Sequence, residues 1–339
     1  MIWDKVEIIT EKGETVLAQA PVIVSASRST DIPTFYADWF VERWKIGYVK
    51  WKNPFNGTPL YISFKNTKVV VFWTKNPKPM LKYLDFLEEN VKNYYFQFSL
   101  NNYDEEGFEG KVPRVESRIK TFIELSNRIG KDKVVWRFDP LLLTNNIDVK
   151  ELLKRVEKIG NELFQYTNKL VFSFADISIY KKVENNLKRE NIIYNEFTLD
   201  TMTEFADGLK KLNSRWGLEL ATCAEKFDLV KYGINHNKCI DDDLMIKLFN
   251  KDNDLMKFLG VEFTKSTLFD ENGGIRKTKK IKDKGQREAC GCIMSKDIGE
   301  YNTCPHECVY CYANTSKDLA FNNYKTHTVN PKAETIIGN

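Results

Sequence analysis

Short apolar runs alternate with longer amphipathic stretches between residues 22 and 223. The apolar runs are rich in Val, Ile, Phe and Leu, which is typical of parallel strands that are buried on both faces. They predict strands at residues 22–27, 48–53, 69–74, 94–100, 134–140, 170–176 and 218–223. The amphipathic stretches predict helices at residues 36–46, 78–92, 115–129, 147–160 and 200–214.

Residues at the ends of these stretches support the helix boundaries. Gly47 and Gly130 each follow a predicted helix, where glycine is common as a C-terminal cap. Pro77 precedes one helix, and Asp148 and Asp200 are candidate N-caps of two others. The repeated strand–helix steps predict an α/β fold, a complete or partial (β/α) TIM-type barrel with a C-terminal Cys-rich segment. A doubly wound open sheet is the alternative, although no G-x-G-x-x-G sequence follows the first strand.

Most of the predicted strands end in polar residues. In a barrel the carboxyl ends of the strands converge on one face, where such enzymes place their chemistry, so we expect a substrate cavity there. Its lysines favour an anionic ligand. The candidate catalytic or substrate-binding residues are Arg28, Asp31, Lys50, Lys52, Lys75, Arg137, Asp139, Asp176 and Glu225. The alternative is a structural role for each, such as a helix cap at Asp31 or a buried ion pair of Arg137 with Asp139.

The character of the sequence changes near residue 264. We predict a barrel over residues 1–263, and over residues 264–339 a connector and a Cys-rich segment that packs on the barrel mouth. The connector is polar, basic and glycine-containing, which indicates a mobile linker. The tail after residue 315 is short and polar, so we expect it to add little to a core.

The chain has seven cysteines, and five of them lie between residues 290 and 311. We expect a cytoplasmic protein, because the chain starts without a secretory segment and has no apolar run of membrane-spanning length. Thiols stay reduced in that compartment, which favours metal or redox chemistry over disulfides. Cys304, Cys308 and Cys311 have the spacing C-x3-C-x2-C, so three thiolates of one loop can bind three irons of a [4Fe–4S] cluster and leave the fourth iron open.

The remaining cysteines are Cys223, Cys239, Cys290 and Cys292. Four thiolates complete a second [4Fe–4S] cluster or a structural zinc site, and either would fasten the C-terminal segment to the barrel. Alternatively, Cys223 or Cys239 is a small core residue. Zinc is also an alternative at the three-Cys loop, where His306 would complete a Cys3His ligand set. His236 and His327 have no partner at ligand spacing.

The sequence TCPHECVYCYAN at residues 303–314 resembles the cluster-binding loop of the radical S-adenosylmethionine (SAM) superfamily, and especially its spore photoproduct lyase branch. The resemblance implies that the three cysteines bind a [4Fe–4S] cluster, that SAM chelates the open iron, and that Tyr310 packs near the adenine. It makes Tyr312 and Asn314 further candidates for cofactor binding. Reductive cleavage of SAM would give a 5′-deoxyadenosyl radical, which abstracts hydrogen from a substrate.

The position of the loop departs from that superfamily. There the three-Cys loop usually follows the first strand of a partial barrel, whereas here it follows the whole predicted barrel. Either the barrel is circularly permuted or the loop folds back over the barrel mouth. The chain as a whole looks like an uncharacterised group of proteins, a domain of unknown function, with its Cys-rich motif at the C-terminus.

Three classes of function follow from these features. The first is a radical SAM-type enzyme with an external electron donor and an unknown, nucleotide-like or other small-molecule substrate. The second is an iron–sulfur redox or electron-transfer protein without SAM chemistry, and the third is a zinc-stapled nucleic-acid-binding protein that uses the basic stretch 276–284. The net charge of +4, from 51 basic and 47 acidic residues, is too even to support nucleic-acid binding, and we expect no membrane partner.

Overall fold

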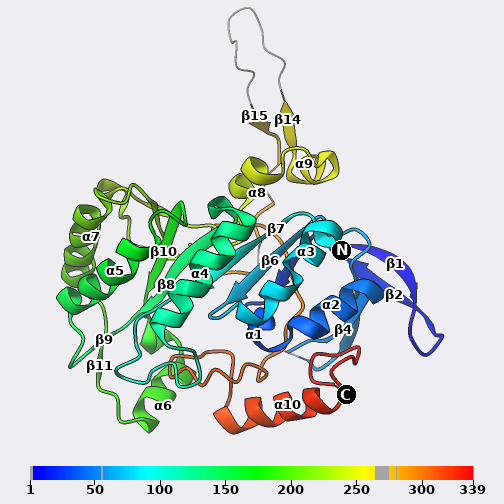
Figure 1. The fold of residues 1–339 in the computed structure, drawn as a ribbon, viewed down its shortest axis with the longest axis horizontal. Helices are drawn as coiled ribbons and strands as arrows, with labels where there is room; N and C mark the ends of the chain where they lie inside the picture. The colour runs from blue at the N-terminus through cyan, green and yellow to red at the C-terminus, as the bar shows by residue number, and fades with distance from the viewer. Residues whose placement is uncertain (1–2, 55, 264–274, 280, 284, 339) are drawn as a thin grey trace, which may run out of the picture.

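A parallel β-sheet of eight strands forms the centre of the molecule (Figure 1). The computed structural model describes residues 3–54, 56–263, 275–279, 281–283 and 285–338. The order across the sheet is β13-β12-β10-β8-β7-β6-β3-β16, and each neighbouring pair is parallel. The strands are β3 (Ile23–Ala26), β6 (Val69–Thr74), β7 (Tyr94–Ser99), β8 (Val134–Leu141), β10 (Lys169–Phe174), β12 (Glu219–Thr222), β13 (Ile234–His236) and β16 (Lys296–Asp297).

All strands except β16 follow one another across the sheet in chain order. β16 comes from the C-terminal segment and pairs with β3, the first strand of this sheet. β13 and β16 are its edges, and no pairing joins them in the described part of the chain. The predicted α/β fold with a large parallel sheet is therefore confirmed. Closure into a barrel and the domain boundary at residue 264 stay predictions.

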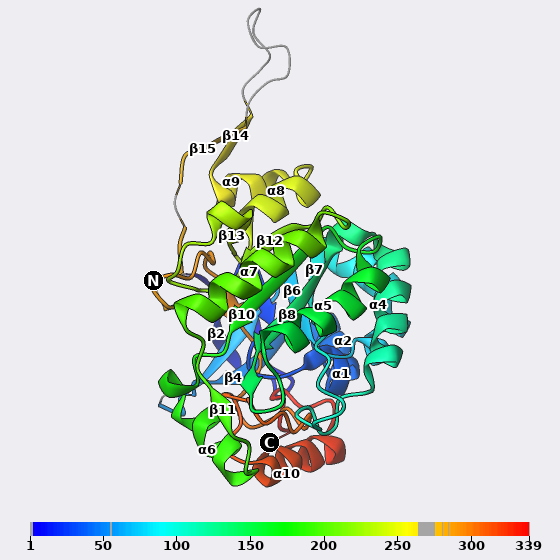
Figure 2. The same ribbon diagram turned by 90° about the vertical axis from the view of Figure 1, so that its left-hand side faces the viewer.

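Helices cover one face of the sheet, where alternate strand residues are large and apolar (Figures 1 and 2). Phe72, Phe96 and Trp136 lie on this face and are fully buried. The covering helices are α2 (Ala37–Ile46), α4 (Val115–Ile129), α5 (Val149–Leu163) and α7 (Leu199–Asn213), and their buried residues join the same core cluster. Also described are α1 (Ile32–Phe35), α6 (Lys181–Arg189), η3 (Lys131–Lys133), η4 (Ile177–Ile179) and η5 (Val230–Tyr232), with the short strands β9 (Leu143–Thr144) and β11 (Tyr194–Asn195).

The opposite face carries smaller apolar residues and polar groups. Ile23, Val69, Val71 and Tyr95 pack there against α8 (Asp242–Phe249) and α9 (Asn253–Leu259). Figures 1 and 2 show α8 and α9 at one end of the molecule, together with the pair β14 (Val261–Phe263) and β15 (Ile275–Lys277). The last helix, α10 (Lys317–Val329), lies at the opposite end.

The prediction that residues 48–53 belong to the central sheet was wrong. β4 (Tyr48–Lys52) lies in a separate sheet of order β1-β2-β5-β4, with β1 (Asp4–Ile9), β2 (Thr15–Ala20) and β5 (Pro59–Ser63). β4 and β5 are antiparallel, and the intervening loop contains Asn56-Gly57, a dipeptide typical of hairpins. Lys50 and Lys52 therefore project from this smaller sheet and not from the carboxyl edge of the central one.

Three local predictions also need correction. Residues 78–92 form a 3-10 helix η1 (Lys78–Tyr83), a short α3 (Leu84–Phe86) and a π-helical turn η2 (Leu87–Val91) in place of one regular helix. Thr198, not Asp200, is the N-cap of α7, because its hydroxyl accepts the backbone N–H of Thr201. The C-terminal tail does contribute to the core, since α10 buries His327 and the carbonyl of Ala333 accepts a hydrogen bond from Trp39.

Asp297 in β16 fixes the C-terminal segment to the end of β3. Its carboxylate accepts hydrogen bonds from Ser25 Oγ at 3.0 Å, Ser27 Oγ at 2.6 Å and the backbone N–H of Arg28 at 2.8 Å. The backbone N–H of Gly299 adds a fourth bond at 2.9 Å. A Cβ atom at Gly299 would collide with the side chain of Ser27, so only glycine permits this close approach.

No helix among the described residues is long and apolar enough to cross a lipid bilayer.

The Gly299→Ala substitution should lower the free energy of unfolding by about 1–3 kcal/mol, the usual cost of overpacking a close contact. Urea titration measures this change. Gly110→Ala is the matched control, because its new methyl group would meet Glu307 Cβ at an ordinary 3.6 Å. Equal stabilities of the Gly299→Ala variant and the natural protein would contradict the close packing of β16 on β3.

Candidate functional site

Cys304, Cys308 and Cys311 lie in one loop against the segment that follows β7. The backbone N–H of Val309 donates to the carbonyl of Phe108 at 2.9 Å, and Cys308 forms a β-bridge with Glu109. Burial, the Glu109 carboxylate and the two neighbouring cysteines raise the pKa of the Cys308 thiol, against the opposing effect of Lys75. The three sulfur atoms therefore lie close enough to influence one another, and a metal would have to displace their protons.

Tyr310 anchors this loop to the carboxyl ends of β6 and β7. Its hydroxyl is hydrogen-bonded to the Glu109 carboxylate, and it also accepts from Lys75 Nζ at 3.1 Å and Asn101 Nδ2 at 3.0 Å. Glu109 in turn pairs with Lys75 at 2.7 Å and with Arg118 at 3.2 Å. Burial alone would raise the pKa of Glu109, but these two cations outweigh it and lower the pKa to about 2. The anchor is thus a buried ionic network.

A second anchor joins the loop to the end of β3. His306 Nε2 lies 2.8 Å from Asp31 Oδ2, and both side chains are buried. Asp31 also accepts the backbone N–H of Lys75 at 2.7 Å and caps α1 through Thr34 N–H at 3.0 Å. His306 Nδ1 is buried and has no hydrogen-bond partner in the described part of the chain. Asp31 therefore serves as a helix cap, as the sequence alternative held, and also holds the loop.

The face of the sheet opposite helices α2, α4, α5 and α7, called the inner face below, carries a polar network beside the loop. Arg137 forms an ion pair with Asp139, which also accepts a hydrogen bond from Ser173. Arg137 and Arg28 both stack on the ring of Trp73, at 5.2 Å and 5.5 Å from its centroid. Arg28 Nη2 is buried and lacks a hydrogen-bond partner among the described residues. The network thus includes one buried donor that an anionic ligand would satisfy.

The other four cysteines also come together. The Sγ atoms of Cys223 and Cys239 lie 3.5 Å apart, and Cys292 Sγ accepts the backbone N–H of Cys239 at 3.2 Å. Cys290 and Cys292 are close enough for their side chains to interact, which contributes to a Cys290 pKa of about 7. Cys239, Cys290 and Cys292 are buried and Cys223 is half-buried. Residues that are far apart in the sequence therefore form one sulfur-rich group.

The remaining candidates have mixed surroundings. Tyr312 donates to the carbonyl of Arg28 at 2.9 Å, and Asn314 donates to the carbonyl of Cys304 at 2.7 Å, so both brace the loop. Lys50 Nζ lies over the ring of Tyr61, at 5.7 Å, in the smaller sheet.

Asp176 and Glu225 follow β10 and β12, the fifth and sixth strands of the sheet in chain order. Asp176 approaches Arg287 of the C-terminal segment at 3.6 Å. Glu225 accepts the backbone N–H of Phe174 at 3.1 Å, and burial together with Asp176 raises its pKa to about 7. Both carboxyls thus lie on the same edge of the sheet as the three-Cys loop, where the carboxyl ends of parallel strands meet.

A family model matches most of the chain. The model of a domain of unknown function, DUF1848, matches residues 23–313, a span that runs from β3 through the last cysteine. The chain belongs to the DUF1848 family. A comparison with curated proteins finds no match. A solved structure of a protein provisionally assigned as an alpha-L-fucosidase from Bacteroides thetaiotaomicron VPI-5482 is 14% identical over 70% of this chain and 84% of that one, with a TM-score of 0.25, too low to carry an argument.

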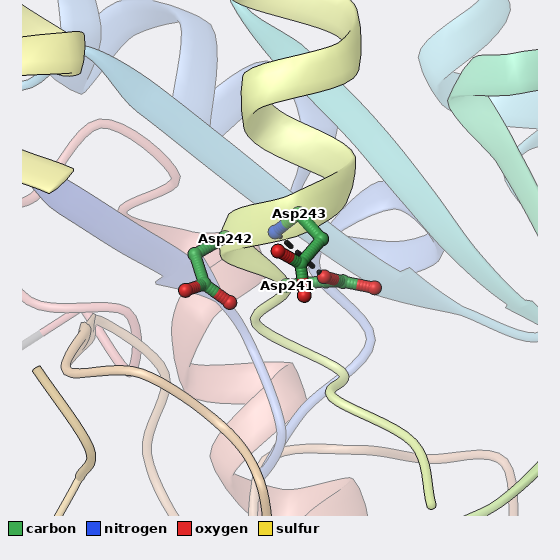
Figure 3. A group of neighbouring side chains, drawn as sticks. All are labelled: Asp241, Asp242 and Asp243. Carbon is green, nitrogen blue, oxygen red and sulfur yellow. Dashed lines mark hydrogen bonds between the residues drawn. The ribbon is translucent and has the colours of Figure 1, made fainter. Parts of the chain in front are cut away.

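Figure 3 shows the acidic group at the start of α8 in this DUF1848 protein, which nearby lysines neutralise. Asp241, Asp242 and Asp243 place carboxylate oxygens within 4.8 Å of one another. Asp241 caps α8 and lies 3.2 Å from Lys169 Nζ, whereas Asp242 and Asp243 both pair with Lys238 and Lys277. These contacts explain the group as a helix cap with compensating charges.

Two residues of the DUF1848 site were not predicted from the sequence. Glu109 lies in a polar loop and Asp297 in a two-residue strand, so neither belongs to a motif. Their roles depend on partners that are distant in the sequence, so they emerge only from the folded chain.

The buried carboxyl group of Glu300, which lies in the sequence between the two groups of cysteines, should make the free energy of unfolding depend on pH. Burial, opposed by Lys52, raises the pKa of Glu300 to about 7 from 4.5. The folded state binds this proton more tightly than the unfolded chain, so its contribution to stability should fall as pH rises from about 4.5 to about 7. Glu300→Gln should therefore gain stability over the natural protein at pH 8, by up to about 3 kcal/mol, but little at pH 4.5.

Urea unfolding of metal-free protein at both pH values measures this difference. The pKa of Glu225 is raised over the same range. Because Glu225 is present in both proteins, the difference between them reports on Glu300. Parallel curves of stability against pH for the two proteins would contradict the assignment.

Proposed function

We propose that this protein is an iron–sulfur enzyme of the radical SAM type. The observation that carries the proposal is the loop of Cys304, Cys308 and Cys311, which presents three neighbouring thiols at the carboxyl ends of β6 and β7. Three thiolates leave one iron of a [4Fe–4S] cluster without a protein ligand. The similarity of residues 303–314 to the radical SAM superfamily supports SAM as the ligand of that iron. We further propose a (β/α) barrel that is left open between β13 and β16, in a cytoplasmic protein.

The donor set fits such a cluster. Soft thiolates suit iron–sulfur clusters and zinc alike, so the spacing of the ligands matters. Sulfur ligands of one tetrahedral zinc ion lie about 3.8 Å apart, given a bond of about 2.3 Å. The three candidate ligands that lie within 4.8 Å of one another among the described residues are Asp241, Asp242 and Asp243, not the cysteines of the loop. The wider arrangement favours a cluster whose thiolates bind separate irons.

When bound at Cys304, Cys308 and Cys311, the cluster would pass one electron from an external donor to SAM, whose bond between sulfur and C5′ would break to give methionine and a 5′-deoxyadenosyl radical. The chain's own residues would bind the ligand and hold the loop in place. Arg28 offers its unpartnered Nη2 to an anionic group, because its ring stacking on Trp73 holds the guanidinium at the inner face. Tyr310 and Lys75 keep the loop in place through Glu109.

The direct test is SAM cleavage. Anaerobically reconstituted protein should release 5′-deoxyadenosine from SAM under a strong reductant, measured by chromatography with mass detection. Cys308→Ala should lose this activity and the part of the cluster absorbance that the loop contributes, because one iron ligand is removed. Glu307→Gln, in the same loop but paired with Lys111, is the matched control and should retain both. A fully loaded protein that neither binds nor cleaves SAM would contradict the proposal.

One observation favours an iron–sulfur redox protein without SAM chemistry. When His306 Nε2 donates to Asp31, its buried Nδ1 is an acceptor without a partner in the described part of the chain. A histidine that binds a metal usually donates its other N–H to a carboxylate in this way. His306 is therefore the candidate fourth ligand of a cluster that has no open iron.

His306→Gln separates the two functions. Glutamine can still donate to Asp31 but is a poor metal ligand, so the SAM enzyme should keep its iron content and its SAM cleavage. Iron and sulfide quantitation, together with the 5′-deoxyadenosine assay, measures both properties. Loss of iron with an unchanged circular dichroism spectrum would favour the redox protein.

A further inference from the structure

We propose that Cys223, Cys239, Cys290 and Cys292 bind a second [4Fe–4S] cluster, with a protein thiolate on each iron. This site is separate from the three-Cys loop and does not depend on SAM chemistry. Cys223 follows β12, Cys239 follows β13, and the other two come from the C-terminal segment. Three distant parts of the chain thus each contribute sulfur to one place.

Close packing holds the two contributing loops together. The backbone N–H groups of Cys239 and Ile240 point at Cys292 Sγ, at 3.2 Å and 3.4 Å. Gly291 lies against the other loop, where an added Cβ would be 3.2 Å from the carbonyl oxygen of Asn237. Tyr95 and Gln97 both donate to the carbonyl of Cys239, at 2.8 Å and 2.9 Å. These contacts fix the positions of Cys239 and Cys292.

The hydrogen bonds to sulfur indicate thiolates. A neutral thiol is a weak acceptor, whereas a thiolate bound to metal is a strong one. Cys239 Sγ accepts from Arg137 Nη1 at 3.0 Å and from Asn237 Nδ2 at 3.1 Å, in addition to the two donors on Cys292. Arg137 is fully buried, and its charge compensates negative charge on the sulfur atoms. A group of ordinary core cysteines would need none of these donors.

Sequence spacing and geometry favour a cluster over zinc. Structural zinc sites commonly use pairs separated by two to four residues, such as C-x2-C. Cys290 and Cys292 are separated by one residue, and Cys223 and Cys239 stand alone in the sequence. No three of these four cysteines are among the candidate ligands that lie within 4.8 Å of one another. The Sγ atoms of Cys223 and Cys239 lie 3.5 Å apart, but the four cysteines as a set are spread more widely than the ligands of one zinc ion.

One chain of hydrogen bonds connects this site with the three-Cys loop. From Cys239 it runs to Arg137 and Asp139. The backbone N–H of Asp139 donates to Asn101 Oδ1 at 2.8 Å, and Asn101 Nδ2 donates to the hydroxyl of Tyr310 at 3.0 Å. A continuous path of hydrogen bonds across the inner face therefore joins the two groups of cysteines.

The test counts iron, sulfide and zinc in anaerobically prepared full-length protein. The natural protein should hold about eight irons and eight sulfides, because each cluster has four of both. The triple variant Cys304→Ala, Cys308→Ala, Cys311→Ala should retain about four of each. The double variant Cys239→Ala, Cys292→Ala should also retain about four. Asp241→Asn, two residues from Cys239 and still able to cap α8, is the matched control and should retain the full count.

The triple variant tests for the second cluster even if the double variant does not fold. Its reduced electron paramagnetic resonance spectrum should be that of a [4Fe–4S] cluster and should not change when SAM is added, because all four irons have protein ligands. Zinc in place of iron, or no metal, in the folded triple variant would overturn the proposal. Failure of SAM cleavage with about eight irons present would instead count against the proposed function alone.

Discussion

The hydrogen bonds to the Asp297 carboxylate hold the C-terminal segment against the first strand of the central sheet. This contact lies between the two parts of the segment that carry cysteines. Cys292 precedes it by five residues and Cys304 follows it by seven, so both are led to the inner face and carboxyl end of the same sheet. The close approach depends on Gly299, which has no side chain to collide with Ser27. A two-residue strand thereby determines where both candidate metal sites lie.

The charged groups beside the cysteines position the loops of the site and add little to the stability of the fold. Buried ion pairs such as Arg137 with Asp139, and Glu109 with Lys75, have a desolvation cost that about cancels their attraction. Their value is specificity, because each fixes a cysteine-bearing loop at one position. An iron–sulfur cluster with thiolate ligands is negatively charged, and Arg28 and Arg137 on the inner face would compensate the charge of a cluster bound there. The same alternation along β8 that buries Trp136 under the helices directs Arg137 and Asp139 to the inner face.

The main sheet could be predicted because its strands are apolar runs long enough to recognise. β13 and β16 escaped prediction because runs of three and two residues have no readable periodicity. Residues 48–53 have strand character, but the partner of a strand depends on the hairpin turn that follows. The cysteines of the site could be named from count and spacing. Asp297 and Glu109 could not, because their partners are fixed only in the folded chain.

The proposed function depends above all on direct binding of SAM to an open iron at the loop of Cys304, Cys308 and Cys311. Electron–nuclear double resonance on the reduced protein, with SAM that carries ¹⁵N in its amino group and ¹⁷O in its carboxylate, measures this contact. We expect hyperfine coupling of both labels to the cluster in the natural protein, and none in the triple variant that lacks these cysteines. A cluster-loaded natural protein that shows no coupling to either label at saturating SAM would contradict the proposed function.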